Sequence, residues 1–107
     1  MTTVKVAPSL LSADFSQLRH EVGNVEKHGA DWLHLDVMDG NCGPAITIGP
    51  VVIKSLRPHS DLFMDAHLMV NDPENQIDAF AATGVDLLTV QVEATAHLDR
   101  LLRKIKD

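Results

Sequence analysis

The strongest constraint on the fold is the regular alternation of β-like and helix-like segments along the 107 residues. A helix-like stretch follows each of four β-like runs, which cover residues 4–11, 32–37, 63–70 and 87–92. Such alternation implies parallel strands joined by right-handed crossovers, with helices covering the sheet. The sequence therefore predicts an α/β fold.

Helix boundaries are indicated by residues with restricted or permissive backbones. Asp14 or Ser16 can cap the first helix, and glycines follow the first and third helices. The second helix is expected to open near Pro50 and to stop before Pro58, because the residue preceding a proline disfavours helical geometry. The expected helices lie within residues 15–28, 50–57, 73–83 and 98–105.

The spacing of these units is compatible with two architectures. One is a small open sheet; the other is half of a (β/α)8 barrel, about four βα units of a fold that typically needs about 250 residues. Low-complexity segments and long polar linkers are absent from the sequence. We therefore expect residues 1–107 to form a single domain, and periodicity alone does not choose between the architectures.

Histidine and aspartate recur together at the ends of two β-like runs. His34 and Asp36 are two residues apart in one run, and Asp65 and His67 are two apart in the next. Residues two apart share a face of a strand, and α/β proteins gather their sites at the carboxyl ends of parallel strands. An imidazole pair with a carboxylate suits Zn²⁺, Fe²⁺, Co²⁺ or Mn²⁺, which can polarise a carbonyl oxygen during proton transfer. The alternative is that these groups satisfy one another or solvent.

Charge and composition exclude several classes of partner. Nine Lys and Arg residues against fifteen Asp and Glu give a formal charge of −6, so no basic surface is expected to attract nucleic acid or anionic lipid. No apolar run approaches the roughly 20 residues that span a bilayer. The single cysteine, Cys42, excludes an intrachain disulfide, and the first residues lack the apolar core of a signal peptide. We therefore expect a cytoplasmic location.

Three motifs carry a resemblance to a known enzyme family. Residues 6–15 read VAPSLLSADF, residues 29–40 read GADWLHLDVMDG, and residues 65–70 read DAHLMV. This series resembles the ribulose-phosphate 3-epimerases, whose corresponding strings are APS[IL]LSADF, GADW[IL]HxDVMDG and DxHLM[IV]. The likeness runs from about residue 6 to the end of the sequence and implies the N-terminal half of a (β/α)8 barrel.

The resemblance also implies a reaction and a set of site residues. Family members interconvert D-ribulose 5-phosphate and D-xylulose 5-phosphate, in the pentose phosphate pathway, by removing the C3 proton and returning it on the other face. The residues carried over are His34, Asp36 and His67 as ligands of one divalent ion (Zn, Fe, Co or Mn), Asp36 also as a catalytic acid or base, and Ser9, His67, Met38 and Met69 as contacts of the pentulose 5-phosphate substrate.

The sequence departs from the family pattern in three respects. The family's second catalytic aspartate, which is also its fourth metal ligand, comes from the seventh strand, and its phosphate-binding loops follow the last strands; neither falls within these residues. Residues 39–49 read DGNCGPAITIG where the family usually reads DGHFVPNxT[FI]G, which predicts a looser loop over the substrate. Gln91 stands where a histidine is common.

These observations leave competing hypotheses for function. In the first, the chain is an epimerase fragment or subunit that becomes active when a second copy or another half-barrel supplies the missing groups. In the second, it is a catalytically inactive half-barrel that binds metal or oligomerises, since unpaired edge strands must pair with something. In the third, it is a related phosphosugar enzyme such as allulose-6-phosphate 3-epimerase. Self-association, as a homo-oligomer or with a second half-barrel, is expected under the first two.

Overall fold

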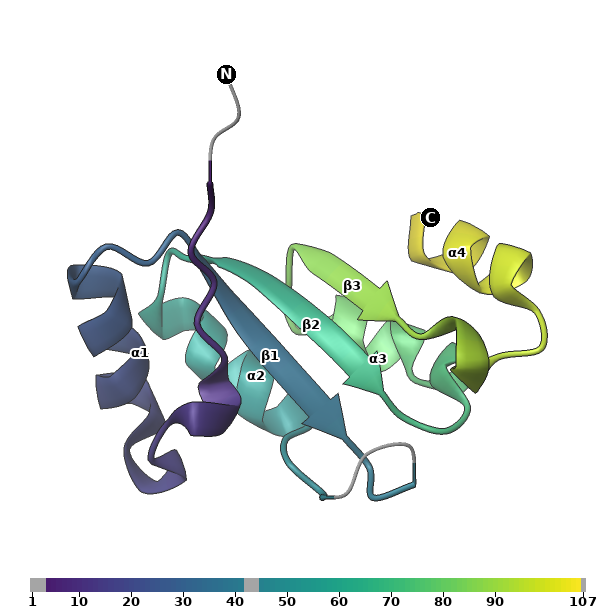
Figure 1. The fold of residues 1–107 in the computed structure, drawn as a ribbon, viewed down its shortest axis with the longest axis horizontal. Helices are drawn as coiled ribbons and strands as arrows, with labels where there is room; N and C mark the ends of the chain where they lie inside the picture. Colours follow the sequence, from purple (N-terminus) through teal and green to yellow (C-terminus); the bar gives the residue numbers. More distant parts are fainter. Residues whose placement is uncertain (1–3, 42–44, 107) are drawn as a thin grey trace.

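The computed structural model describes residues 4–41 and 45–106 (Figure 1). Within these residues the strands form one parallel sheet in the order β1-β2-β3, with bounds Trp32–Met38, Phe63–Met69 and Leu87–Val90. A helix follows each strand along the chain, as parallel pairing requires. The predicted α/β class with a parallel sheet is therefore confirmed.

The first predicted strand, residues 4–11, differs from the expectation. The segment lies alongside β1, where the Val6 carbonyl accepts hydrogen bonds from the amides of Asp31 and Trp32 at 2.9 and 3.1 Å, but only Ser9 forms a β-bridge, to His34. Pro8 has no amide proton to donate to a ladder, and the Val6 amide donates to the Asp31 side chain instead. The sheet in the described residues therefore has three strands where the sequence predicts four.

The helices agree more closely with the expected boundaries. They are α1 Leu18–Lys27, α2 Pro50–Leu56, α3 Ile77–Ala81 and α4 Leu98–Lys106, with one-turn 3-10 helices η1 Leu10–Ser12, η2 Phe15–Gln17, η3 Arg57–His59, η4 Pro73–Asn75 and η5 Val92–Ala94. Pro50 lies in the first turn of α2, and Gly29 adopts a φ of 95° after α1. The third helix is divided, because residues 73–75 form a 3-10 turn before α3 begins. None of the helices in the described ranges has both the length and the apolar character needed to cross a membrane.

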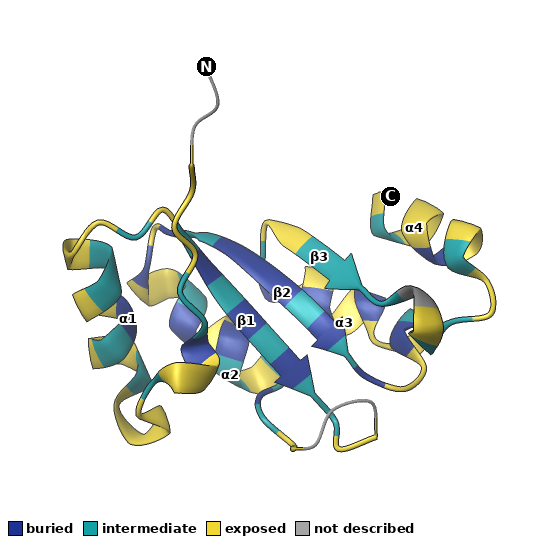
Figure 2. Cartoon of the chain, in the orientation of Figure 1, coloured by how far each residue is buried: buried dark blue, intermediate teal, exposed yellow. Residues whose placement is uncertain are grey.

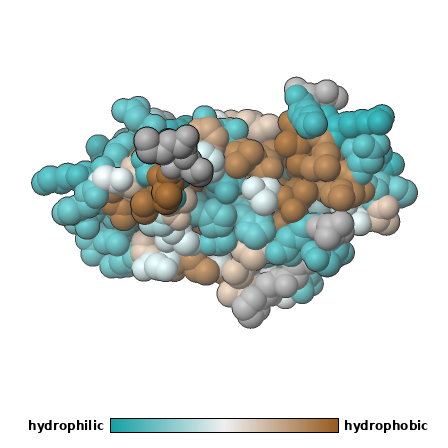
Figure 3. Space-filling view, turned by 45° about the horizontal axis from the view of Figure 1, so that its top comes forward, coloured by the Kyte–Doolittle hydropathy of each residue, from teal (hydrophilic) through white to brown (hydrophobic). Residues whose placement is uncertain are grey.

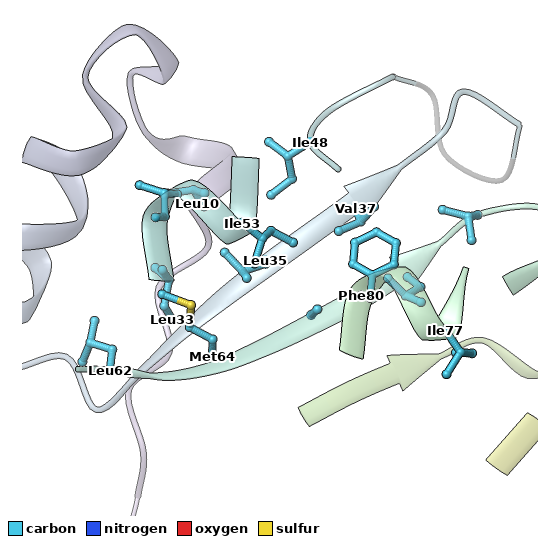
Figure 4. Packing of buried hydrophobic residues seen from close by; sticks show 14 of the residues in the cluster. Leu10, Leu33, Leu35, Val37, Ile48, Ile53, Leu62, Met64, Ile77 and Phe80 are labelled. Carbon is cyan, nitrogen blue, oxygen red and sulfur yellow. The ribbon is translucent and has the colours of Figure 1, made fainter. Parts of the chain in front are cut away.

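One face of the sheet is buried against helices. Along β1, buried side chains alternate with partly exposed ones, so that Leu33, Leu35 and Val37 point into the core (Figures 2 and 4). They belong to the same buried cluster as Ile53 of α2 and Phe80 of α3. The alternation leaves the opposite face of β1 with its polar side chains partly accessible.

Helix α4 is held to the rest of the molecule by Glu74. The Glu74 carboxylate accepts hydrogen bonds from the Thr95 hydroxyl at 3.0 Å and from Arg100 at 2.8 and 3.2 Å. The Thr95 hydroxyl and the Arg100 guanidinium hold the pKa of the Glu74 carboxyl below its ordinary value. Leu101 of α4 is fully buried in the core. The last helix is therefore docked by both polar and apolar contacts.

Two glycines provide a matched test of backbone geometry. Gly84 has a φ of 91°, and a Cβ added there would lie 2.9 Å from Cγ of Arg57, whose guanidinium donates to the Ser60 and Leu62 carbonyls. Gly84→Ala is therefore expected to lower the free energy of unfolding by about 1–2 kcal/mol. Gly23 lies in α1 with nothing within 4 Å of an added Cβ, so Gly23→Ala is expected to raise it by roughly 0.5–1 kcal/mol. Urea denaturation measures the change in the free energy of unfolding for each variant. Changes of the same sign in the two variants would contradict the assigned backbone conformations.

Candidate functional site

The register of the sheet brings the predicted polar residues together on its partly exposed face. His34 of β1 pairs with Asp65 of β2, and Asp36 of β1 pairs with His67 of β2. Side chains directly opposite one another on neighbouring strands lie close enough to interact. The two H-x-D-like patterns therefore form one cluster.

The distances within this cluster are short enough for a shared cation. His34 Nε2 lies 3.0 Å from Asp36 Oδ1, and His67 Nδ1 lies 3.7 Å from the same oxygen. One ligand atom from each of His34, Asp36 and His67 lies within 4.8 Å of the others. The side chains are 26, 15 and 23% exposed, so the cluster is partly desolvated but reachable from the open face of the sheet.

The protons available to His34 show that these residues fit a cation. Nε2 of His34 faces Asp36 Oδ1 at 3.0 Å, and Nδ1 faces Asp65 Oδ2 at 3.1 Å. A neutral imidazole carries a single N–H, so it can donate to only one of two ionised carboxylates. A metal ion held at one ring nitrogen would leave this N–H for the carboxylate at the other. The donor set of two imidazoles and one carboxylate is of the kind that binds Zn²⁺, Fe²⁺, Co²⁺ or Mn²⁺.

Ser9 reaches the cluster from the segment that precedes η1. Its hydroxyl donates to Asp36 Oδ2, while Asp36 Oδ1 faces the two imidazoles. The bridge between Ser9 and His34 sets this position, since it fixes the segment beside β1. The structure thus brings Ser9, His34, Asp36 and His67 together, as the sequence predicts for site residues.

Met38 and Met69 occupy the ends of their strands. The two residues are paired in the register and partly buried, on the same face as the cluster and beyond it along the strands. Their predicted contact with substrate stays a prediction.

Two further side chains join the site, although the sequence analysis did not predict them as site residues. They are Thr89 in β3 and Gln91, which directly follows that strand. The Thr89 hydroxyl donates to Asp65 Oδ1 at 2.8 Å, and Gln91 Nε2 lies 3.5 Å from His67 Nε2. The signal for both was available, because period-two alternation in the run at 87–92 places Thr89 and Gln91 on one face. Gln91, recognised in the sequence only as a departure from the family pattern, therefore lies beside a candidate ligand.

The loop after β1 is tied to the neighbouring backbone near both of its ends. Asp39 Oδ2 accepts a hydrogen bond from the Asn71 amide at 2.8 Å, which joins the loops that follow β1 and β2. The Thr47 hydroxyl donates to the Asp36 carbonyl and accepts from the Met38 amide. The predicted looseness of the loop depends on Cys42 and Gly43, which lie outside the described residues.

Comparison with known proteins decides the family. The model of the ribulose-phosphate 3 epimerase family matches residues 5–107. The chain belongs to this family. Its members are TIM-barrel enzymes, in agreement with the parallel sheet described above.

Individual ribulose-phosphate 3-epimerases cover nearly all of the chain. The enzyme of Bacillus subtilis is 52% identical over 104 residues, which are 97% of this chain and 48% of that protein. The enzyme of Synechocystis is 47% identical over 106 residues, which are 97% of this chain and 46% of that protein. The chain therefore spans about half the length of these curated relatives.

A solved structure provides independent evidence for the fold. The carboxyl transferase domain of Rhizobium etli pyruvate carboxylase superposes with a TM-score of 0.59 at 19% identity, covering 94% of this chain and 20% of that one. At this identity the likeness concerns the fold alone. Together with the family match, it assigns the epimerase motifs to an α/β framework.

Proposed function

We propose that the chain provides the N-terminal half of a (β/α)8 epimerase site that interconverts D-ribulose 5-phosphate and D-xylulose 5-phosphate. The observation that carries the proposal is the cluster of His34, Asp36 and His67 on the open face of the sheet. The similarity to ribulose-phosphate 3-epimerases supplies the substrate class. The reaction would serve the pentose phosphate pathway in the cytoplasm.

His34, Asp36 and His67 would hold one divalent ion, Zn²⁺, Fe²⁺, Co²⁺ or Mn²⁺. When bound, such an ion polarises a carbonyl oxygen and stabilises the negative charge that develops on it. The environment of His34 supports this assignment, because a cation bound at Nε2 beside Asp36 would leave the ring N–H at Nδ1 for Asp65.

Asp36 is the group that would move the C3 proton on one face of the substrate. Its carboxylate is 15% exposed on the accessible face of the sheet, and the Ser9 hydroxyl donates to Oδ2. Ser9 would orient this carboxylate, and Met38 and Met69 would line the substrate pocket beyond it.

Epimerisation needs a second acid or base on the opposite face of the planar intermediate. The other carboxylate at the described site, Asp65, is engaged with His34 and Thr89 on the same side. The second group and the phosphate contacts would therefore come from another half-barrel, for which the resemblance implies an aspartate. A separate half-barrel that carries this aspartate would bring it, whereas a second copy of this chain would have to supply one of its own carboxylates.

The edges of the sheet support association. Within residues 4–41 and 45–106, β3 pairs on one side only, with β2. Apolar surface gathers on the side of the molecule that carries β3 and α4, where Leu87 and Leu102 are exposed (Figure 3). Unpaired strand edges beside apolar surface favour pairing with another chain.

Turnover by the purified 107-residue chain tests the proposal. Ribulose 5-phosphate would be supplied with Zn²⁺, Fe²⁺, Co²⁺ or Mn²⁺, with a chelator-treated control, and the assembly state would be followed by sedimentation. The expected result is metal-dependent formation of xylulose 5-phosphate by a species larger than the monomer. Folded, metal-binding protein without turnover would contradict the epimerase activity and favour the inactive half-barrel. A folded monomer would contradict the association.

A further inference from the structure

A row of polar contacts crosses all three strands of the described sheet and ends at His34. The Thr89 hydroxyl of β3 donates to Asp65 Oδ1 of β2 at 2.8 Å, and Asp65 Oδ2 lies 3.1 Å from Nδ1 of His34 in β1. The register pairs Asp65 with His34 and Thr89 with His67, so the Thr89 hydroxyl reaches Asp65 diagonally between β3 and β2. The Asp65 side chain is only 13% exposed, so water competes little for these contacts.

The chemistry of the row determines which nitrogen of His34 carries the proton. Nε2 lies on the side of the candidate cation site, facing Asp36, and a ring that ligates through Nε2 keeps its single N–H at Nδ1, where Asp65 Oδ2 can accept it. In a neutral ring, Nε2 then carries the lone pair, and Nε2 is the nitrogen that faces Asp36. The Thr89 hydroxyl occupies Oδ1 and leaves Oδ2 to His34, which orients the carboxylate toward the ring.

We infer that Asp65, held by Thr89, is a positioning residue that fixes the tautomer and ring orientation of His34 so that Nε2 is presented as a ligand. The part of this inference that makes His34 a metal ligand rests on the proposed function. A carboxylate that receives the second N–H of a ligating imidazole raises the basicity of the ligand and restrains its ring. Asp65 would thus act through His34 without touching the metal or the substrate.

A merely structural role for Asp65 makes different predictions. A carboxylate that serves only folding would lower stability when replaced, but it would leave the His34 tautomer and the metal affinity unchanged. The substitution Asp65→Asn discriminates, because the amide group of asparagine can donate to Nδ1 and so permit the other tautomer. Thr89→Val removes the orienting hydroxyl, and Thr89→Ser restores it.

Two measurements are needed, one of which does not involve metal. The first is the nitrogen-15 NMR spectrum of the His34 ring in the metal-free 107-residue chain, recorded at about pH 8, above the ordinary histidine pKa. The second is the affinity for Zn²⁺ by competition with a chromophoric chelator. Matched controls are Asp86→Asn, which removes a carboxylate that accepts from the Met64 amide just before β3, and Thr83→Val, which removes a buried hydroxyl bonded to Phe80.

The expected result is that Asp65→Asn shifts the metal-free tautomer population toward Nε2–H relative to the unmodified chain and weakens the Zn²⁺ affinity roughly 10–100-fold. Thr89→Val should change the tautomer population and the Zn²⁺ affinity in the same direction but by less, and Thr89→Ser should restore both quantities. The two control variants should keep the values of the unmodified chain. A folded Asp65→Asn that keeps the tautomer and the affinity would overturn the inference. If Asp65→Asn does not fold, Thr89→Val with unchanged values overturns it. A chain that binds no Zn²⁺ but shifts toward the Nε2–H tautomer in Asp65→Asn would reject the metal site and support the positioning role.

Discussion

Asp36→Asn is expected to abolish metal-dependent epimerisation, with a loss of about 10²–10⁴-fold from the proton-transfer role alone. The carboxylate faces both imidazoles through Oδ1 and receives the Ser9 hydroxyl at Oδ2, so it would serve as ligand and as base at once. Asparagine keeps the size of the side chain but removes its charge and its capacity to accept a proton. The rate of xylulose 5-phosphate formation and the Zn²⁺ affinity of the same preparation measure the two losses.

The control for this experiment is the loss of a carboxylate elsewhere on the sheet. Asp86 accepts hydrogen bonds from the Met64 amide and from Arg57, and it is not one of the three candidate ligands. Asp86→Asn should lower stability and leave Zn²⁺ affinity and turnover per folded molecule unchanged. Retention of metal affinity in Asp36→Asn would show that Asp36 is not a ligand.

Phe80→Ala is expected to lower the free energy of unfolding by about 3–5 kcal/mol. Phe80 is 2% exposed and fills the space between α3 and the buried face of the sheet (Figure 4). Helix α3 has only five residues, which is too short to be stable without packing, so its position depends on such side chains. Urea denaturation followed by circular dichroism measures the change.

The same substitution at an exposed position is the matched control. Phe15 in η2 is 41% exposed and lies outside the buried cluster. Phe15→Ala should therefore change the free energy of unfolding by less than about 1 kcal/mol. Similar losses at the two positions would contradict the assigned core.

Local sequence rules predicted the helices and three of the strands. Proline can begin a helix but not continue one, and glycine readily adopts positive φ, so Pro50, Pro58 and Gly29 carry boundary information in themselves. The segment at residues 4–11 could not be assigned in this way. Its apolar residues resemble a strand, but whether a ladder forms depends on which neighbouring groups bond to Val6 and on the missing amide of Pro8.

The candidate ligands were also predictable in part. Period two places His34 with Asp36 and Asp65 with His67, and neighbouring parallel strands bring the pairs together. The exact register of β1 and β2 places Asp36 where it faces both imidazoles. This register is set when the strands pack into the sheet, so it could not be predicted from the sequence of either strand. For the same reason, the contact from Thr89 to Asp65 could not be read from either strand alone.

The sparse attachment of the N-terminal segment has a dynamic consequence. The segment is joined to β1 through the amides of Asp31, Trp32 and His34, which donate to the Val6 and Pro8 carbonyls. Regions with few such bonds open locally at a lower free energy than the body of a sheet. Detachment of this segment would withdraw Ser9 from Asp36 while β1 and β2 remain paired. Deuterium uptake at those three amides would therefore report how often the carboxylate is released, separately from the unfolding of the whole chain.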